Sequence, residues 1–579
     1  MEKIQAIPAN YNVTDVMLNA LQDWGVSYLF CNLGSDHPAL IESFAKAKAQ
    51  NRQIPEVIMC PHEFAALSAA HGHALLSGRA QGVIVHTDVG TQNMGGSLHN
   101  IQRSRVPAFI FAGETPFTLE GELQGGRNSH INHLQNVYDQ RGIVRSYVKW
   151  DYEIRTGKNV KQLVNRGMQL AHSEPMGPVY LTGAREILEE EVSPSENVSA
   201  EWKPVEKIPL PLLAVEQIVS ALIQARNPLI ITSYLGRNTD AVPQLVQFCE
   251  KLAVPVIEQH ATHMNFPGDH PFHLGYQGGT LLSEADAILV MDCDVPWVSS
   301  ISKPSDACKV FYIDSDPLKE EIPLWYLQNT TFYRADCGEA LKLLNEYVRR
   351  IDLQTERFTE RRHRFTELHK RQRHEWKLRE KAPSGDTITS EWLTACLRNV
   401  TDDETIFMNE TITNAGVVSQ HLPRNKPATM FVNGGTSLGW SGSAAFGAKL
   451  ARPETTVVNL TGDGSYLFGE PSAVYWMTRR YQAPLLTVIY NNRGWNATKM
   501  NLLKLYPDGI AKRDDRYWVN FDQPADLAKI AEASGGAYAR TIKRPDELQE
   551  ALQAGMEAVK KGQSAVIDVH LPTISQQID

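Results

Sequence analysis

Short apolar runs alternate with longer segments of helical period through the first part of the chain. Residues 61–76 have the composition and spacing of a helix, and β-rich runs bounded by turn-forming residues occupy 26–30, 82–86, 108–112 and 177–181. Strands that alternate with helices are joined by crossover connections, which makes neighbouring strands parallel. The pattern predicts a doubly wound α/β domain over residues 1–190.

The same alternation recurs twice. Apolar runs at 228–231, 287–290 and 310–313 predict a second α/β domain over 205–348, after a polar, proline-containing linker at 191–208. A third domain over 388–579 is predicted from strands at 405–408, 456–460, 485–490 and 565–569. The charged segment 349–387, helical in period from 353, is predicted to be a solvated connecting helix rather than a binding element. The fold expected is α/β, with three doubly wound parallel-sheet domains.

Composition narrows the classes of partner. The 579 residues are too many for one hydrophobic core, and a net charge of −9 with no long basic run argues against nucleic acid. A small anionic substrate must therefore meet a local positive site. The seven cysteines form no CxxC pair, which argues against disulfides or zinc and for a reducing compartment. No segment resembles a signal peptide or a membrane span, so a cytoplasmic protein without membrane partners is expected.

Two motifs follow neighbouring strands of the third predicted domain. Gly462-Asp463-Gly464-Ser465 comes after the strand at 456–460, and Asn491-Asn492-Arg493-Gly494 comes after the next strand. The carboxyl ends of parallel strands are where open α/β sheets bind ligands. Glycines and a helix N-terminus suit a diphosphate, and carboxylate, amide and carbonyl oxygens suit Mg²⁺. We therefore predict a Mg²⁺–diphosphate site, with metal ligands Asp463, Asn492 and a carbonyl near Gly494.

This pair of motifs resembles the fingerprint of thiamine-diphosphate enzymes, and the resemblance extends over nearly the whole chain. It is to the three-domain group that contains benzoylformate decarboxylase, pyruvate decarboxylase and the acetolactate synthase catalytic subunit. The resemblance implies thiamine diphosphate and Mg²⁺ as cofactors and a pyrimidine-binding, a central and a diphosphate-binding domain. It also implies that the diphosphate is held by Asn409, Glu410, Thr411, Gly462, Gly464 and Ser465.

A single acid stands on the small, apolar helix that begins near His62. Glu63 would be costly to bury without a partner, although an acid in a first helical turn is also favoured by the helix dipole. The segment resembles the family's activating helix, which implies that Glu63 hydrogen-bonds N1′ of the aminopyrimidine and favours the tautomer that takes the C2 proton. The resemblance also assigns Leu438 as the apolar wedge beneath the bent cofactor.

The substrate residues are a mixed set. Asn32-Leu33-Gly34-Ser35 and the strand end at His86 resemble benzoylformate decarboxylase, which implies substrate hydrogen-bonding and proton-transfer roles for Ser35 and His86. Gln135 is similar to a glutamine of acetolactate synthases. His130 and His133 lie in the loop where pyruvate decarboxylases carry a histidine pair, but at another spacing, and residues 294–299 hold no second histidine. The roles of the two loop histidines stay open.

The resemblance implies decarboxylation of a 2-oxo acid, ligation of the resulting enamine to an aldehyde or second 2-oxo acid, or both. A flavin-dependent oxidase of the pyruvate oxidase type is the alternative, although no G-x-G-x-x-G follows a strand in the central domain. A catalytically silent homologue is disfavoured because Glu63, Asp463 and Asn492 are all present. The family's architecture implies a homodimer or homotetramer, in which the Glu63 domain of one subunit faces the diphosphate domain of another.

Overall fold

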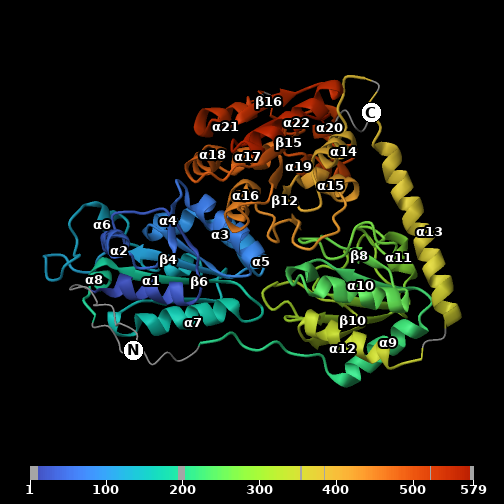
Figure 1. Cartoon of the computed structure of the whole chain (residues 1–579), viewed down its shortest axis with the longest axis horizontal. Coiled ribbons are helices and arrows are strands. Elements are labelled where there is room, and N and C mark those ends of the chain that lie inside the picture. The colour runs from blue at the N-terminus through green and yellow to red at the C-terminus, as the bar shows by residue number, and fades with distance from the viewer. Residues whose placement is uncertain are drawn as a thin grey trace.

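A computed structural model describes residues 11–192, 202–352, 355–383, 385–521, 523 and 525–573. Half of the predicted first linker, residues 193–201, lies outside them. The chain forms three lobes, coloured blue to cyan, green to yellow, and orange to red in Figure 1. Each lobe is built on one parallel sheet, which confirms the predicted fold of three doubly wound α/β domains. No helix within the described ranges combines the length and the apolar character needed to cross a bilayer.

The N-terminal domain has a six-stranded sheet in the order β2-β1-β3-β4-β6-β5. Its inner strands are buried on both faces, so they read as continuous apolar runs. The strands are β1 Tyr28–Cys31, β2 Glu56–Met59, β3 Gln81–Val85, β4 Ala108–Glu114, β5 Trp150–Glu153 and β6 Pro178–Ala184. The helices are α1 Val13–Asp23, α2 Pro38–Ala49, α3 Glu63–Ser77, α4 Thr87–Asn93, α5 Gly95–Arg103, α6 Ile131–Leu134, α7 Val160–His172 and α8 Arg185–Leu188, with 3₁₀ turns at Arg141–Ile143 and Gly157–Asn159.

The central domain has a five-stranded sheet in the order β11-β10-β9-β7-β8. Its strands are β7 Pro228–Thr232, β8 Val256–Glu258, β9 Ala287–Met291, β10 Lys309–Asp314 and β11 Thr330–Arg334. Its helices are α9 Leu212–Gln224, α10 Ala241–Leu252, α11 Gly279–Glu284 and α12 Cys337–Arg349, with a 3₁₀ turn at Leu235–Arg237.

The C-terminal domain repeats the six-stranded arrangement in the order β13-β12-β14-β15-β17-β16. Its strands are β12 Ile406–Glu410, β13 Met430–Phe431, β14 Val457–Gly462, β15 Leu486–Asn491, β16 Tyr538–Ile542 and β17 Ala565–His570. Its helices are α14 Ser390–Val400, α15 Ala415–His421, α16 Trp440–Ala451, α17 Asp463–Phe468, α18 Pro471–Arg480, α19 Asn496–Leu505, α20 Ile510–Arg513, α21 Leu527–Gly535 and α22 Pro545–Lys560, with a 3₁₀ turn at Ile412–Asn414.

The three sheets share one topological feature. In each, the first strand lies inside the sheet, with the second strand on one side of it and the third on the other. The loops after the first and third strands therefore diverge, which opens a crevice at their carboxyl ends where doubly wound folds bind ligands. These switch points lie between β1 and β3, between β7 and β9, and between β12 and β14.

Helix α13, Thr355–Arg379, runs along one side of the molecule from the central to the C-terminal domain (Figure 1). The prediction of a solvated helix is wrong for one face. Phe358, Phe365 and Trp376 are buried, and Arg361 donates to the carbonyls of Leu222 and Ala225 at the end of α9. The helix is charged overall, yet this stripe fastens it to the central domain.

Candidate active site

A cleft of about 310 Å³ opens at the switch point of the C-terminal sheet. Its walls come from the loops after β12, β14 and β15 and from the segment before α16. The lining residues are Thr411, Ile412, Thr413, Leu438, Gly462, Asp463, Gly464, Ser465, Phe468, Asn492, Gly494, Trp495, Asn496, Ala497 and Thr498. The cleft therefore gathers both sequence motifs and the predicted apolar wedge, Leu438, although they lie far apart along the chain.

The three predicted metal ligands, Asp463, Asn492 and Gly494, all line this cleft. Asp463 begins α17, is almost fully buried, and accepts a hydrogen bond from the Gly494 N–H at 2.8 Å. Burial raises the pKa of Asp463 to about 6. Asn492 lines the cleft and donates its Nδ2 to Thr413 Oγ1 at 3.1 Å, which leaves its Oδ1 available as an acceptor. A buried carboxylate destabilised by the lack of a counter-charge, beside an available amide oxygen, fits a hard dication such as Mg²⁺.

This donor set differs from a zinc or iron site. Across the described ranges, no group of three or more His, Cys, Asp or Glu side chains is placed to hold a metal ion. A cation at Asp463 would therefore complete its shell with backbone carbonyls, water or a bound phosphate, which is the usual habit of Mg²⁺.

The last two residues of β12, Asn409 and Glu410, and the next residue, Thr411, make different contacts. Thr411 lines the cleft, and Asn409 Oδ1 accepts from the Thr411 N–H and hydroxyl at 3.1 and 2.8 Å, which fixes the loop. Glu410 instead points to the start of α16 and accepts the Ser441 N–H at 2.9 Å. Burial raises the pKa of Glu410 to about 7. Its carboxylate thus caps a helix N-terminus rather than facing the cleft.

Glu63 lies in the N-terminal domain at the first position of α3, after the N-cap His62, whose Nδ1 accepts the Phe64 N–H. Its carboxylate is buried and accepts a hydrogen bond from Asn93 Nδ2 at 3.1 Å. Gly90 of α4 lies against its Oε1. The bond from Asn93 uses one carboxylate oxygen, which leaves the carboxylate capacity to accept a further hydrogen bond.

The residues predicted to touch substrate lie close to one another. His86 directly follows β3, and its Nδ1 lies 2.5 Å from Asp36 Oδ1. The Gln135 side chain is close enough to interact with the ring, so His86 and Gln135 lie beside each other. Ser35 is exposed beside Asp36 in the loop after β1. The sequence interpretation missed Asp36, although it directly follows Ser35.

The two loop histidines stand apart from this group. His130 is the N-cap of the short helix α6 and His133 lies within it, and both side chains are exposed. His133 Nδ1 lies 3.1 Å from Arg127 Nη1, so that histidine is engaged on the surface of the loop.

Within one chain, the domain that carries Glu63 packs against the domain that carries the cleft. Every residue that lines the diphosphate cleft belongs to the C-terminal domain, and Glu63 is not among them. Helix α3 packs along α16, where Trp440 Nε1 donates to His71 Nδ1 at 3.0 Å. The ring of Phe64, next to Glu63, lies 6.4 Å from the ring of Phe468 at the cleft.

The switch point of the central sheet is filled by side chains, which we call the central ion cluster: Tyr234, Asp314, Lys319, Asp294 and Arg105. Lys319 is fully buried and donates to Asp314 Oδ2 at 2.7 Å and to Tyr234 Oη at 2.8 Å. Arg105, from the N-terminal domain, forms two bonds to the Asp294 carboxylate at 2.6 and 3.0 Å and lies over the Tyr234 ring. These two cations hold the pKa of Asp294 well below its usual range, although burial opposes them.

A second ion pair joins the same two domains. Arg237, after β7, bonds both oxygens of Glu174 at 2.9 Å and lies 3.7 Å from Asp292, whose pKa is raised by burial. The crevice that would receive a ligand in the central domain is therefore occupied by paired charges.

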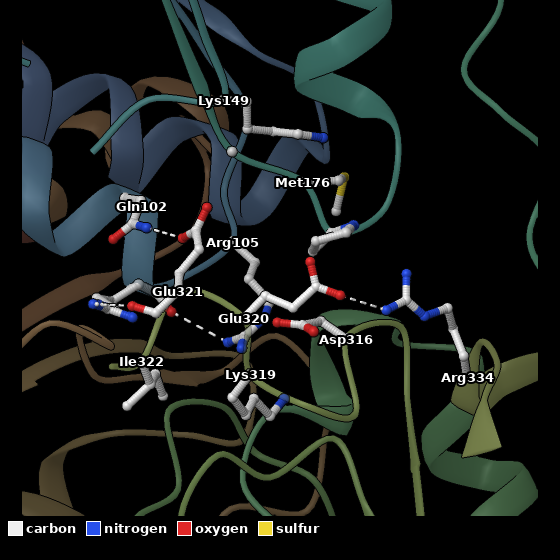
Figure 2. Close-up of a pocket in the computed structure, with 13 residues that line it drawn as sticks. Gln102, Arg105, Lys149, Met176, Asp316, Lys319, Glu320, Glu321, Ile322 and Arg334 are labelled. Atoms are coloured by element: carbon white, nitrogen blue, oxygen red, sulfur yellow. Dashed lines mark hydrogen bonds and ion pairs between the residues drawn. The ribbon is translucent and has the colours of Figure 1, made fainter. Parts of the chain in front are cut away.

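A small polar cleft of about 130 Å³ remains beside the cluster, between the N-terminal and central domains (Figure 2). Figure 2 shows Gln102 bonded to Glu321 across it, and Glu320 bonded to Arg334 at its rim. Lys149 donates to two backbone carbonyls at the end of α7, and burial lowers its pKa to about 8. The charged groups of this cleft are thus engaged in several ways: Glu320 pairs with Arg334, whereas Lys149 is held by backbone carbonyls.

Comparison with known proteins agrees with this geometry. Sequence models of the thiamine pyrophosphate enzyme N-terminal TPP-binding, central and C-terminal TPP-binding domains match residues 11–143, 215–342 and 411–569. Acetolactate synthase from Bacillus subtilis is 22% identical over 571 residues, covering 94% of this chain and 91% of that protein. Benzoylformate decarboxylase from Pseudomonas aeruginosa is 25% identical over 499 residues, covering 83% and 85%.

The architecture is also found among solved structures. The thiamine diphosphate-dependent 4-hydroxybenzoylformate decarboxylase of Rhodococcus jostii RHA1 superposes with a TM-score of 0.79 at 21% identity. The superposition covers 97% of this chain and 99% of that one, and it shows a shared three-domain fold. The chain belongs to the thiamine pyrophosphate enzyme family.

Proposed function

We propose that this protein uses thiamine diphosphate and Mg²⁺ to decarboxylate a 2-oxo acid, and that it passes the product either to a proton, which gives an aldehyde, or to a second carbonyl compound. The observation that carries the proposal is the cleft in which Asp463, Asn492 and Leu438 meet. The relatives named above support a 2-oxo acid substrate, because benzoylformate is itself a 2-oxo acid.

The C-terminal domain would hold the charged end of the cofactor. Asp463, the Asn492 amide oxygen and the Gly494 carbonyl would bind Mg²⁺, and Thr411, Gly464 and Ser465 would contact the diphosphate. When bound, thiamine diphosphate supplies a thiazolium carbon that adds to the substrate carbonyl and an electron sink for the bond to the departing CO₂. Leu438 would support the bent cofactor from its apolar side.

The N-terminal domain would manage protons. Glu63, held by Asn93, would keep a proton at the pyrimidine ring. Conversion of a 2-oxo carboxylate to an aldehyde and CO₂ consumes one proton, and His86 would deliver it from a ring nitrogen and recover it from water. Ser35 and Gln135 would bind the substrate's oxygens beside it.

A flavin-dependent oxidase is the less favoured chemistry. The central switch point, where a dinucleotide would bind, holds the buried Lys319 and its carboxylate partners. A flavin would have to displace these paired charges from a low-dielectric site. We infer that the protein works without flavin.

Assembly is part of the proposal. A site that needs Glu63 opposite Asp463 is incomplete within the cleft of one chain, whose lining is entirely C-terminal. Exposed apolar side chains surround both half-sites, including Leu134 and Tyr138 in one domain and Trp495 and Trp518 in the other. We propose a homodimer, or a tetramer made of two such dimers, in which the N-terminal domain of each subunit completes the other's site.

The test is to supply a panel of 2-oxo acids, alone and with excess aldehyde, to protein loaded with thiamine diphosphate and Mg²⁺, and to identify products by mass. We expect CO₂ release with at least one substrate, and we expect His86→Ala to slow aldehyde release more than hydroxyketone formation. Glu63→Gln is the matched inactive control. Protein that binds cofactor stoichiometrically yet consumes no 2-oxo acid would refute the proposal. Free aldehyde as the sole product across all acceptors would refute the ligation branch.

A further inference from the structure

Asp36 and His86 meet at the switch point of the N-terminal sheet. Asp36 follows β1 and His86 follows β3, so their loops diverge on either side of the crevice. One carboxylate oxygen lies 2.5 Å from His86 Nδ1, and the other accepts the Thr87 N–H at 3.2 Å. A single buried side chain thus holds both the imidazole and the first amide of α4.

Two glycines, Gly34 and Gly113, lie beside the contact between Asp36 and His86. A Cβ on Gly34 would lie 2.2 Å from His86 Nδ1, and a Cβ on Gly113 of β4 would lie 1.8 Å from Asp36 Oδ2. Both distances are too short for atoms that are not bonded to each other, so a side chain at either position would clash. The two glycines therefore permit the carboxylate and the ring to approach each other, one from each side of the contact.

The turn that carries His86 is strained. Thr87, a β-branched and buried residue, has φ of +38°, in the left-handed region that such residues avoid. Strained backbone persists where the surrounding structure holds it, and such positions cluster at functional sites. The hydrogen bond from the Thr87 N–H to Asp36 stabilises this strained residue, which is next to His86.

The electrostatic surroundings of His86 are defined by three titratable groups: Asp36 and His37 from the loop after β1, and Asp88 from α4. The hydrogen bond to Asp36 raises the pKa of His86 and outweighs the opposing effect of burial, while Gln135 and Asp88 act in the same direction as Asp36. Burial lowers the pKa of His37, so that ring stays neutral beside them.

We propose that Asp36 is a positioning residue for His86: it holds the Nδ1–H, so that Nε2 is the nitrogen presented to substrate, and it keeps the ring in the protonated form that donates to the product. This inference rests on the proposed function, because the donation it serves is the proton consumed when aldehyde is released. Asp36 acts through His86 and need not touch the substrate itself.

The direct test uses the protein without cofactor or metal. We would label its histidines with ¹⁵N, assign His86 by its loss in His86→Gln, and titrate the ring by NMR. In wild type we expect the neutral ring to keep its proton on Nδ1. A neutral wild-type ring with an unprotonated Nδ1 would overturn the proposal. This measurement needs no substitution at Asp36, so it stands even if variants at that position fold poorly.

The variant Asp36→Asn then tests the charge of the side chain while nearly keeping its shape. Its amide oxygen can still accept the Thr87 N–H, but its NH₂ faces Nδ1, so the neutral ring should move its proton to Nε2 and the titration should shift to lower pH. Asp88→Asn is the matched control, because that carboxylate bonds Gln92 and acts on the ring only through space. An Asp36→Asn titration identical to wild type, or no different from Asp88→Asn, would overturn the proposal.

The kinetic readout distinguishes positioning from mere support of the turn. In Asp36→Asn, aldehyde release should fall by about tenfold or more at pH 8 and recover as the pH is lowered, in step with the NMR titration and with little change in KM. An equal loss at every pH would leave only a structural role and overturn the proposal. A wild type with the expected NMR behaviour that consumes no 2-oxo acid would refute the proposed function alone.

Discussion

The strongest prediction concerns the charge on Asp463 when no metal is bound. The carboxylate is buried, and its pKa is raised from 3.8 to about 6 by that burial. At neutral pH this difference corresponds to about 3 kcal/mol of destabilisation of the cofactor-free domain. Asp463→Asn removes the charge but weakens one hydrogen bond from the Gly494 N–H, worth about 1 kcal/mol. We therefore expect the metal-free variant to be more stable than wild type by about 2 kcal/mol.

The pH dependence has a definite sign. Because the folded-state pKa of Asp463 lies above its unfolded value, the wild type is relieved of the penalty at low pH and loses stability as the pH rises from about 4 to about 6. The advantage of Asp463→Asn should thus shrink as the pH is lowered from 7 towards 5. Mg²⁺ binding should weaken as the pH is lowered over the same interval, because the ion must displace the proton.

The assay is hydrogen exchange of metal-free protein, followed by mass spectrometry in peptides from β14 and α17. A gain of 2 kcal/mol should slow globally exchanging amides roughly 30-fold at pH 7.5. Exchange in Asp463→Asn as fast as in wild type would refute the argument from a buried, uncompensated charge.

The variants Asp463→Asn and Asp463→Ala should both lose bound thiamine diphosphate on gel filtration in Mg²⁺. Retention of the cofactor would refute the assignment of Asp463 as a metal ligand.

Three further outcomes are expected. Glu63→Gln should fold and bind thiamine diphosphate but slow C2-proton exchange of the bound cofactor by about 10²-fold, and a wild-type exchange rate would contradict the assignment of Glu63. Sedimentation should give a dimer or tetramer of 64.7 kDa chains, and a fully active monomer would contradict the shared site. Arg105→Met should destabilise the protein to urea by about 2 kcal/mol, because it leaves Asp294 partly unpaired beside Lys319, whereas Arg145→Met at an exposed pair should change little.

The sequence predicted most accurately the strands whose side chains must be buried on both faces of a sheet. Strands buried on both faces, such as β7 and β9, are nearly continuous apolar runs and were predicted within a few residues. Edge strands such as β5 and β11 are partly exposed, so their patterns do not stand out from loops. Helix α13 was misread as solvated because Phe358, Phe365 and Trp376 form a narrow stripe among many charges.

Some residues of the candidate site could be predicted from the sequence and others could not. Asp463 and Asn492 stand in motifs whose backbone geometry demands glycines and strand ends, so both could be predicted to line one cleft. Glu410 could not be separated from Thr411, because adjacent residues leaving a strand point in opposite directions and the helix that Glu410 caps begins thirty residues later. Asp36 acts through a contact between loops 50 residues apart, and no spacing along the chain signals that contact.

The central ion cluster has a mechanical consequence. Arg105 and Glu174 belong to the N-terminal domain, whereas their partners Asp294 and Arg237 belong to the central one. Rotating one domain against the other would part both pairs at once in a medium that screens charge poorly. The two ion pairs therefore resist rotation of the N-terminal domain against the central one, and Glu63 and His86 are carried on the domain that they hold in place.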